Sequence, residues 1–413
     1  MILQKKYVNF IGVSFLTELT FLLIYFALTW IKLRTKCHQI TVCPPPAHGA
    51  QTDEISQRLT SRKQYYDEIN YFRGLVIFLI VWSHMKTLVW SGYDPSSLNT
   101  SWEFVRRLFS VLVTGNTAMF VFISGFLFYA IFYKRGFDYK TFIKGKILKV
   151  FVPWFLISTV FLFYRVYRGH GDLTDTHFVI YGGYFYWSFW YIPFIMLVFF
   201  VSPLYLKFIE LSKKSQFLIL GLSTIISMCL GRHETNPVLS LIFWNSFYLY
   251  GIFLAQNYQK FLNLSKLDKQ CLICMGLLII FVSSFSDKTA WFHGYSTYDI
   301  HFGEVIEWAL FAKIFSIALL LFLFIKIKSM PSSVFHIILK KLAKYSFSIF
   351  FLQQFFILWF ERNSFTKFLP DLNFWEAHIV SILFACFICY LCIFFAFAIK
   401  TLTGKYSRMI IGA

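Results

Sequence analysis

Two residues that can do chemistry, an arginine and a histidine, lie in one strongly apolar stretch of the chain. The stretch runs from Asp67 to Met85, with Arg73 near its start and His84 near its end. At 3.6 residues per turn, this step of about eleven residues is about three turns, so both side chains project from one helix face, about 16 Å apart along the axis. A histidine in a membrane helix is costly unless it faces protein or a water-filled cavity. The spacing therefore predicts a site, with a cation at the membrane surface and a titratable imidazole below it.

The composition indicates the class of protein that carries this site. Of its 413 residues, 58% are hydrophobic and only 14% are charged, which is too apolar for a soluble domain. A formal net charge of +19 would suit a nucleic-acid-binding protein. The distribution of the charge excludes that class, because lysines and arginines gather in the segments that flank apolar runs, as membrane topology requires.

The apolar runs predict an all-α polytopic integral membrane protein with about eleven transmembrane helices. Residues 1–65 are expected to form an extra N-terminal helix and a cytoplasmic linker, and residues 66–413 a transmembrane domain of about ten helices. Most lysines and arginines fall on the side of the segment before Arg73, which places the N-terminus outside and the C-terminus in the cytoplasm. We expect a multi-pass protein of the cell (cytoplasmic or inner) membrane, with anionic lipid headgroups as neighbours. The expected spans are 7–31, 72–91, 113–133, 148–166, 186–207, 216–231, 237–256, 269–285, 303–325, 343–361 and 375–399.

The most basic loop follows the span at 113–133. Its last cations, Lys144, Lys146 and Lys149, stand where the next helix enters the membrane, on the side expected for Arg73. Positive-inside topology accounts for most of these charges. Cations and helix N-terminal amides also attract phosphate, so a polyanionic cofactor is the functional alternative.

Acidic residues stand near the expected outer end of the 303–325 span. Glu304 and Glu307 are three positions apart and share a helix face, and Lys313 follows within the same span. Ionisable residues inside a membrane favour a functional interpretation. An ion pair with Arg106 or Arg107 is the structural alternative.

The cysteines and the tryptophans have simpler interpretations. Cys271 and Cys274, and the trio Cys386, Cys389 and Cys392, have spacings typical of zinc sites but lie inside apolar spans without a nearby histidine. We expect them to pack as small apolar residues, and we expect no metal site. Trp187, Trp190 and Tyr191 are expected to form an interfacial aromatic belt.

With these segments in order, the chain resembles the membrane-bound acyltransferase 3 family. The resemblance is carried by E-I-N-Y-F-R-G-L with its Arg73–His84 step, and by F-V-F-I-S-G-F-L. Weaker matches follow in family order: K-I-L-K-V-F-V-P, W-Y-I-P, F-Y-L-Y-G-I-F-L-A and S-F-S-I-F-F-L-Q. The similarity covers all but the first span and linker, and the capsule and intercellular-adhesin branch is nearest in length. Membership would imply transfer of an acyl group, usually acetyl from acetyl-CoA, to a hydroxyl of a surface carbohydrate.

Three departures from the family pattern concern the same region. Asn70 stands where the family commonly has Asp, which removes a carboxylate partner. Gln353 occupies the place of a frequent second histidine. Lysines replace arginines common in the basic loop, which keeps the charge but loses bidentate phosphate contacts.

The resemblance assigns roles to the polar residues. Thioester-to-hydroxyl transfer needs a base, a place for the oxyanion and two aligned substrates. His84 would be the base, or less favourably an acyl carrier, and Arg73 would hold the CoA portion of acyl-CoA. The remaining candidates are Lys144, Lys146 and Lys149 for CoA, and Glu304, Glu307, Ser124, Asn116 and Gln353 for the carbohydrate acceptor.

Two other functions stay open at this point, as does homo-oligomerisation. A membrane exporter of a polysaccharide or lipid-linked glycan would line its path with the same intramembrane polar residues. A non-catalytic membrane scaffold would not require His84, which would then be a satisfied core histidine.

Overall fold

The computed structural model describes residues 66–90, 100–167, 187–230, 232–233, 236–285, 294–295, 307–330, 333–362, 372 and 374–412. These residues belong to one unit, Tyr66–Ala413. The expected span at 7–31 and the linker after it lie outside the described residues.

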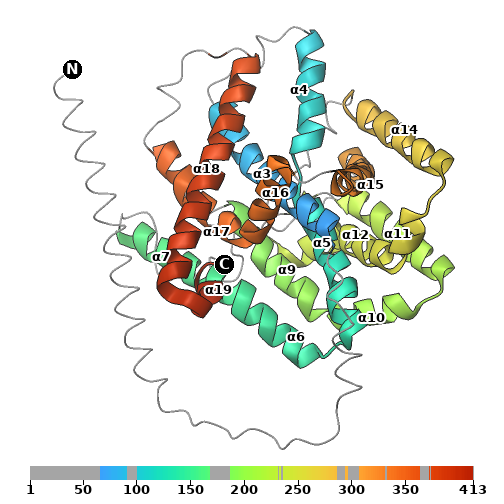
Figure 1. Cartoon of the computed structure of the whole chain (residues 1–413), viewed down its shortest axis with the longest axis horizontal. Helices are drawn as coiled ribbons and strands as arrows, with labels where there is room; N and C mark the ends of the chain where they lie inside the picture. Colours follow the sequence, from blue (N-terminus) through green and yellow to red (C-terminus); the bar gives the residue numbers. More distant parts are fainter. Residues whose placement is uncertain are drawn as a thin grey trace, which may run out of the picture. The chain divides into compact units, whose positions relative to one another are not determined.

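The described part is almost entirely helical, as expected from the sequence, and its main helices are labelled in Figure 1. The α-helices are α3 (Asp67–Trp90), α4 (Thr100–Val113), α5 (Thr117–Leu127), α6 (Tyr139–Lys146), α7 (Val152–Tyr167), α9 (Tyr191–Phe200), α10 (Ser202–Glu210), α11 (Lys213–Leu230), α12 (Pro237–Gln256), α13 (Tyr258–Leu262), α14 (Lys266–Ser283), α15 (Trp308–Lys328), α16 (Val334–Lys344), α17 (Ser346–Arg362), α18 (Phe374–Thr403) and α19 (Ser407–Ile410). Short 3-10 or π turns are η3 (Phe128–Phe132), η4 (Tyr133–Arg135), η5 (Ile147–Phe151), η6 (Trp187–Trp190) and η8 (Gly404–Tyr406). Two short strands, β1 (Arg232–His233) and β2 (Gly294–Tyr295), pair in parallel.

Helix α3 is the element around which the others pack. Its apolar run forms one unbroken helix of 24 residues, and Asp67 and Glu68 in the first turn complement the helix dipole. It contacts α4, α5, α15, α16, α17 and α18 (Figure 1). The Asp67–Met85 stretch therefore lies inside the bundle, where its polar side chains face protein.

Among the described residues, five helices are long and apolar enough to cross a membrane, and a sixth is added if the bent pair α9 and α10 is one span. The angle within that pair is 54°, at the Val201–Ser202–Pro203 junction where proline cannot continue the hydrogen-bond ladder. The expected count of about eleven is not confirmed, because α7 and α17 are shorter and α11 and α14 begin with lysine-containing turns. The five are Asp67–Val89, Phe104–Arg135, Pro237–Gln256, Trp308–Lys328 and Phe374–Ile410.

Helices α5 and α12 approach each other until their backbones touch. A side chain on Gly125 would collide with the backbone of Tyr248, and one on Gly251 would collide with the backbone of Phe122. Small residues permit this contact, which van der Waals packing and weak backbone interactions stabilise in membrane bundles. The small pair Ser124–Gly125 therefore lies where the two backbones meet.

We expect Gly251→Ala to lower the midpoint of thermal unfolding in detergent. The added methyl group has to push α5 away from α12, and overpacking of this kind costs about 1–3 kcal/mol. The matched control is Gly221→Ala on α11, where a Cβ meets no heavy atom within 4 Å. That control should be neutral or stabilising, since alanine favours a helix by about 1 kcal/mol over glycine. Equal midpoints for the two variants would show that the α5–α12 contact is not as tight as described.

The cysteines within the described residues are not arranged as metal ligands. Cys271, Cys274 and Cys386 are exposed, while Cys389 and Cys392 are buried in the core formed by α18 and its neighbours. No group of three or more His, Cys, Asp or Glu side chains in the described ranges is placed to hold a metal ion. The buried pair packs as small apolar side chains do.

Candidate functional site

Arg73 and His84 lie on the same unbroken helix, as their spacing predicts. Both belong to α3, and both side chains are half-buried. Within this helix the rise per residue separates the two groups by about 16 Å along the axis. The site therefore has two ends, one at Arg73 near the helix start and one at His84 near the helix end.

The start of α3 is fixed by a buried carboxylate. Glu68 accepts a hydrogen bond from the Tyr258 hydroxyl (2.6 Å) and a charge-assisted one from Lys328 Nζ (2.8 Å). Asp67 pairs with Lys340 of α16 at 3.4 Å. Hydrogen bonds to charged groups are worth about 1.5–3 kcal/mol each when shielded from solvent. These contacts hold the turn before Arg73 in one orientation.

The helix is also held between Arg73 and His84. Gly74 lies against the backbone of Leu339, so α3 and α16 touch at the residue that follows Arg73. Towards the far end, the Trp82 indole donates to Ser381 Oγ of α18 at 2.9 Å, and its ring meets His378 edge-on. With its rotation fixed at these points, α3 presents His84 in one direction.

His84 belongs to a charged cluster that the sequence analysis did not anticipate. It lies within electrostatic range of Arg232 on β1, and Arg232 lies within electrostatic range of Glu307. The Arg232 guanidinium carbon also lies over the Trp190 ring, 5.6 Å from its centroid. We call His84, Arg232, Glu307 and Trp190 the His84 cluster. Two further segments of the chain thus bring a carboxylate and an aromatic ring to Arg232, the cation within electrostatic range of His84.

A backbone hydrogen bond holds Glu307 in place. Its N–H donates to the Met228 carbonyl at the end of α11 (3.0 Å), and it is the cap residue that starts α15. The residue is fully buried. A carboxylate at a helix N-terminus is favoured by the helix dipole. Glu307 also lies within electrostatic range of Arg232.

The aromatic side of the cluster is part of the protein core. Trp190 and Tyr191 are 5% and 7% exposed, and Trp190 stacks on Trp244 of α12 with 6.1 Å between ring centroids. The interpretation of these two residues as an interfacial belt is wrong, because they are covered by neighbouring helices. A buried, stacked tryptophan gives Arg232 a rigid surface, and cation–π contacts strengthen on desolvation.

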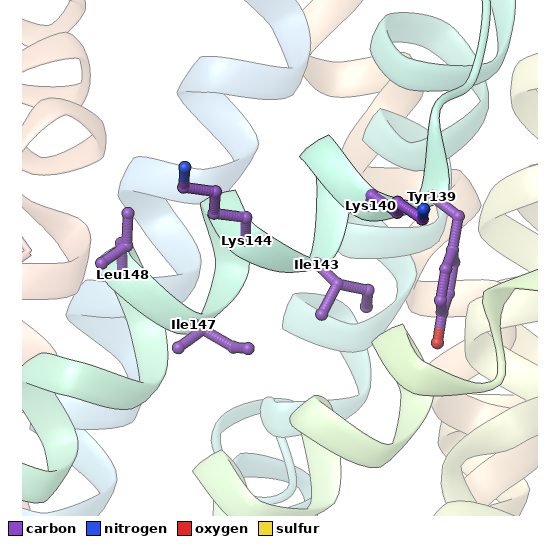
Figure 2. Close-up of a pocket in the computed structure, with 6 residues that line it drawn as sticks. All are labelled: Tyr139, Lys140, Ile143, Lys144, Ile147 and Leu148. Carbon is purple, nitrogen blue, oxygen red and sulfur yellow. The ribbon is translucent and has the colours of Figure 1, made fainter.

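The basic segment begins at an N-cap. Asp138 accepts a hydrogen bond from the Thr141 backbone N–H at 2.9 Å. Hydrogen bonding to Thr141, first through its side chain and then through its backbone, lowers the pKa of the Asp138 carboxyl. Lys144 and Lys149 are exposed beyond it. An open pocket of about 380 Å³ lies along this segment. Figure 2 shows Lys144 on one side of the segment and Ile147 on the other. The pocket is lined by Tyr139, Lys140, Ile143, Lys144, Ile147 and Leu148.

Lys146 is separated from its two basic neighbours. Its ammonium lies over three phenylalanine rings, 4.9 Å from the centroid of Phe132, 5.1 Å from Phe142 and 4.2 Å from Phe199. Burial, reinforced by the charge of Lys149, lowers the pKa of Lys146 to about 8, while the ring faces favour the charged form. The three lysines expected to act together therefore split into two exposed cations and one enclosed in aromatic rings.

The remaining predicted residues are placed as follows. Asn116 is buried at the turn between α4 and α5, where its amide donates to the Val113 carbonyl and its oxygen accepts from Lys313 Nζ at 3.1 Å. Lys313 also donates to the Leu112 carbonyl at 3.0 Å. This geometry makes Asn116 a joint between helices, and it gives the intramembrane Lys313 the partners that a buried cation needs.

Ser124 and Gln353 occupy buried or half-buried positions, and Glu304 lies outside the described residues. Ser124 Oγ donates to the Phe120 carbonyl at 2.9 Å. Gln353 is fully buried, and its side-chain oxygen has no hydrogen-bond partner within the described ranges. Burying an amide oxygen without a hydrogen-bond donor costs about 1–3 kcal/mol of folding free energy. A bound molecule that donates a hydrogen bond to Gln353 would offset this cost.

Comparison with known proteins supplies the family. A family model described as an acyltransferase domain matches residues 66–400, which is most of the chain and includes both ends of the site. The chain matches no curated protein and no solved structure.

Proposed function

Because the chain belongs to the acyltransferase 3 family, we propose that this multi-pass membrane protein is an O-acyltransferase of surface glycans. The donor is cytoplasmic acyl-CoA, with acetyl-CoA first among candidates, and the acceptor is a hydroxyl of a surface polysaccharide or lipid-linked sugar, as in the capsule and intercellular-adhesin branch. The observation that carries the proposal is the placement of Arg73 and His84 on one side of the buried helix α3.

The reaction follows from the chemistry of a thioester and an imidazole. His84 accepts the proton of the acceptor hydroxyl while that oxygen attacks the thioester carbonyl carbon. The resulting tetrahedral intermediate carries a negative oxygen and collapses with cleavage of the carbon–sulfur bond. The CoA sulfur leaves with the proton that His84 held, and the imidazole returns to its neutral form. General-base catalysis of this kind contributes typically about 10²–10⁴-fold in rate.

The donor, acyl-CoA, is proposed to bind to Arg73 and the basic segment. Charge-assisted hydrogen bonds from arginine and lysine are the strongest contacts available to the CoA phosphates. Lys144 and Lys149 are exposed and suit this role, and the apolar lining of the adjacent pocket suits the uncharged part of CoA (Figure 2). Lys146 contributes long-range charge rather than a contact, because the phenylalanine rings enclose its ammonium.

The acceptor is proposed to bind at the opposite end of α3, where His84 lies. Glu304 and Glu307, with Ser124, Asn116 and Gln353 deeper in the bundle, are the polar groups proposed to guide the acceptor hydroxyl to His84. Within the described residues the Gln353 side-chain oxygen has no hydrogen-bond partner, which supports a role in accepting a hydrogen bond from the acceptor. Asn116 would act indirectly, through Lys313 and the α4–α5 turn.

The orientation of the protein follows from the donor. Acyl-CoA is cytoplasmic, so Arg73 and the basic segment would face the cytoplasm of a cell-membrane protein with its C-terminus inside. We expect a single cysteine at position 140, in a variant without the native cysteines, to resist a membrane-impermeant thiol reagent on intact cells and to react after permeabilisation. Lys140 is exposed, so a cysteine there is accessible from its own side. Labelling of position 140 on intact cells would overturn this orientation.

The proposed function is tested by the O-acyl content of surface glycans. Cells that lack the protein should lose base-labile acetate from their surface glycan while the glycan still reaches the surface. Re-expression should restore the acetate. Loss of the glycan itself would favour an exporter, and unchanged acetate and glycan would favour a non-catalytic scaffold.

A further inference from the structure

We propose that the outer face of helix α16 is a binding surface for anionic phospholipid, with its lysines at the headgroups and its apolar side chains among the acyl chains. The charge of the whole chain predicts anionic lipid neighbours without assigning them to any element. The structure offers one element that suits them. The inference does not depend on acyl transfer, since it concerns how a single helix meets the membrane.

The first argument is the position of α16 at the ends of two candidate spans. In its first turn, His336 Nε2 lies 2.9 Å from the carbonyl oxygen of Ile327, in the last turn of α15. In its second half, Lys340 Nζ lies 3.4 Å from Asp67 Oδ1, in the first turn of α3. An ion pair at 2.8 Å joins the same ends of α3 and α15. Both helices are long and apolar enough to cross a membrane, so α16 lies at the level where they leave it.

The length of α16 indicates that it lies along this boundary. Its 11 residues make a helix about 16 Å long, about half the thickness of the hydrocarbon core. One face is fixed to the protein, because the backbone of Leu339 lies against Gly74 of α3 and because Leu342 and Ala343 are buried. The opposite face of α16 is exposed, and we call it the α16 outer face.

The second argument is the composition of the α16 outer face. Four large apolar side chains in the first half of the helix are exposed: Val334, Phe335, Ile337 and Ile338. Ile337 is 62% exposed. Lys341 and Lys344, which follow it by one and two turns, are exposed as well. The sequence of α16, V-F-H-I-I-L-K-K-L-A-K, contains no acidic residue to neutralise these lysines.

Anionic phospholipid is the partner that matches both halves of this face. Apolar side chains beside lysines are typical of helices that lie in the membrane interface. Because lysine has a long alkyl stem, its ammonium can stay at the headgroups while apolar neighbours reach the acyl chains. A zwitterionic headgroup has no net charge, so it would cover the apolar side chains without neutralising Lys341 and Lys344.

The test uses a fluorescent label at position 337. A variant without the native cysteines carries Ile337→Cys with a bimane label, in vesicles of equimolar phosphatidylglycerol and phosphatidylcholine. One of the two lipids is brominated in its acyl chains, and bromine quenches the label only at contact. Each lysine near an anionic surface strengthens binding by up to about fivefold, so we expect phosphatidylglycerol to be favoured at least about threefold at this position.

Two comparisons assign this preference to α16. Lys341→Gln with Lys344→Gln should make the quenching by the two lipids nearly equal. The matched control is Lys214→Gln with Lys260→Gln, which removes the same charge from two exposed lysines on α11 and α13 and should keep the preference. High salt should weaken the preference in the labelled chain with its lysines intact, so this measurement does not depend on how the lysine variants fold.

Each contrary result overturns the inference in its own way. Quenching by neither lipid would place position 337 in water or under another protein chain. Equal quenching by both lipids, with the lysines intact, would exclude a preference for anionic headgroups. An equal loss of preference in the two double variants would show that overall charge attracts the lipid. A preference that excess CoA abolishes would assign Lys341 and Lys344 to the donor. None of these measurements involves acyl transfer, so the inference and the proposed function fail separately.

Discussion

In His84→Gln we expect acyl transfer to become unmeasurable while the protein still accumulates in the membrane. Glutamine keeps polarity and approximate volume but cannot accept a proton, so the variant loses the general-base contribution of about 10²–10⁴-fold. The measurement is base-labile acetate on the surface glycan, normalised to the amount of protein. We expect the fold to be preserved in this variant because α3 is held before the substituted residue, at Glu68 and at Trp82.

Thr87→Ala is the control for this substitution. Thr87 lies one turn beyond Ser83 on the exposed side of α3 and donates only to the Ser83 carbonyl, at 3.1 Å. It should leave acetate at the wild-type level. Normal acylation in His84→Gln would remove His84 as the base. Acylation that persists while surface glycan disappears would instead favour the exporter.

The second large effect is expected at the donor end. Arg73→Ala should weaken binding of CoA about tenfold to a hundredfold, because a charge-assisted contact to phosphate is worth about 1.5–3 kcal/mol. The dependence of binding on salt should also become shallower, since one cation no longer contributes. Binding is measured by titrating the purified protein with CoA at two ionic strengths.

The control for Arg73 is another arginine of the basic region. Arg135 is exposed in η4, on the segment that leads into the basic helix α6. Arg135→Ala should change the affinity for CoA by less than about threefold, in line with the small energies of exposed charges. Unchanged affinity in both Arg73→Ala and Lys149→Ala would refute the placement of the donor.

Helical periodicity was enough to predict the framework of the site. The step from Arg73 to His84 depends only on residues per turn, and one unbroken helix contains both. The close contact of α5 with α12 requires small residues, and Gly125 and Gly251 provide them. Features of this kind are local, so a single segment carries enough information to predict them.

The charged partners of His84 could not be predicted in the same way. Arg232 stands in a short polar segment between two apolar runs, where topology alone accounts for a basic residue. Only packing places Arg232 and Glu307 within electrostatic range of each other, since α11 contacts both α12 and α15. Trp190 was assigned to a membrane interface for the same reason, since its partner Trp244 is distant in sequence.

In the basic segment, the spacing of the lysines did not predict their different environments. Lys144, Lys146 and Lys149 are equivalent in the sequence, but Phe132 and Phe199 come from other elements and enclose only Lys146. Asn116 and Lys313 are the opposite case. A lone lysine in an apolar span needs a partner, and an asparagine in the turn of a neighbouring span was an available signal.

We expect acyl groups to pass from cytoplasmic acyl-CoA to a hydroxyl on the other side of the membrane. The measurement uses inverted membrane vesicles, whose cytoplasmic face is outward, supplied with acetyl-CoA labelled in the acetyl group. Wild-type vesicles should accumulate label as base-labile ester on glycan that is protected inside the vesicle, and His84→Gln vesicles should not. Glycan that enters the vesicles without gaining labelled ester would contradict the account and identify an exporter.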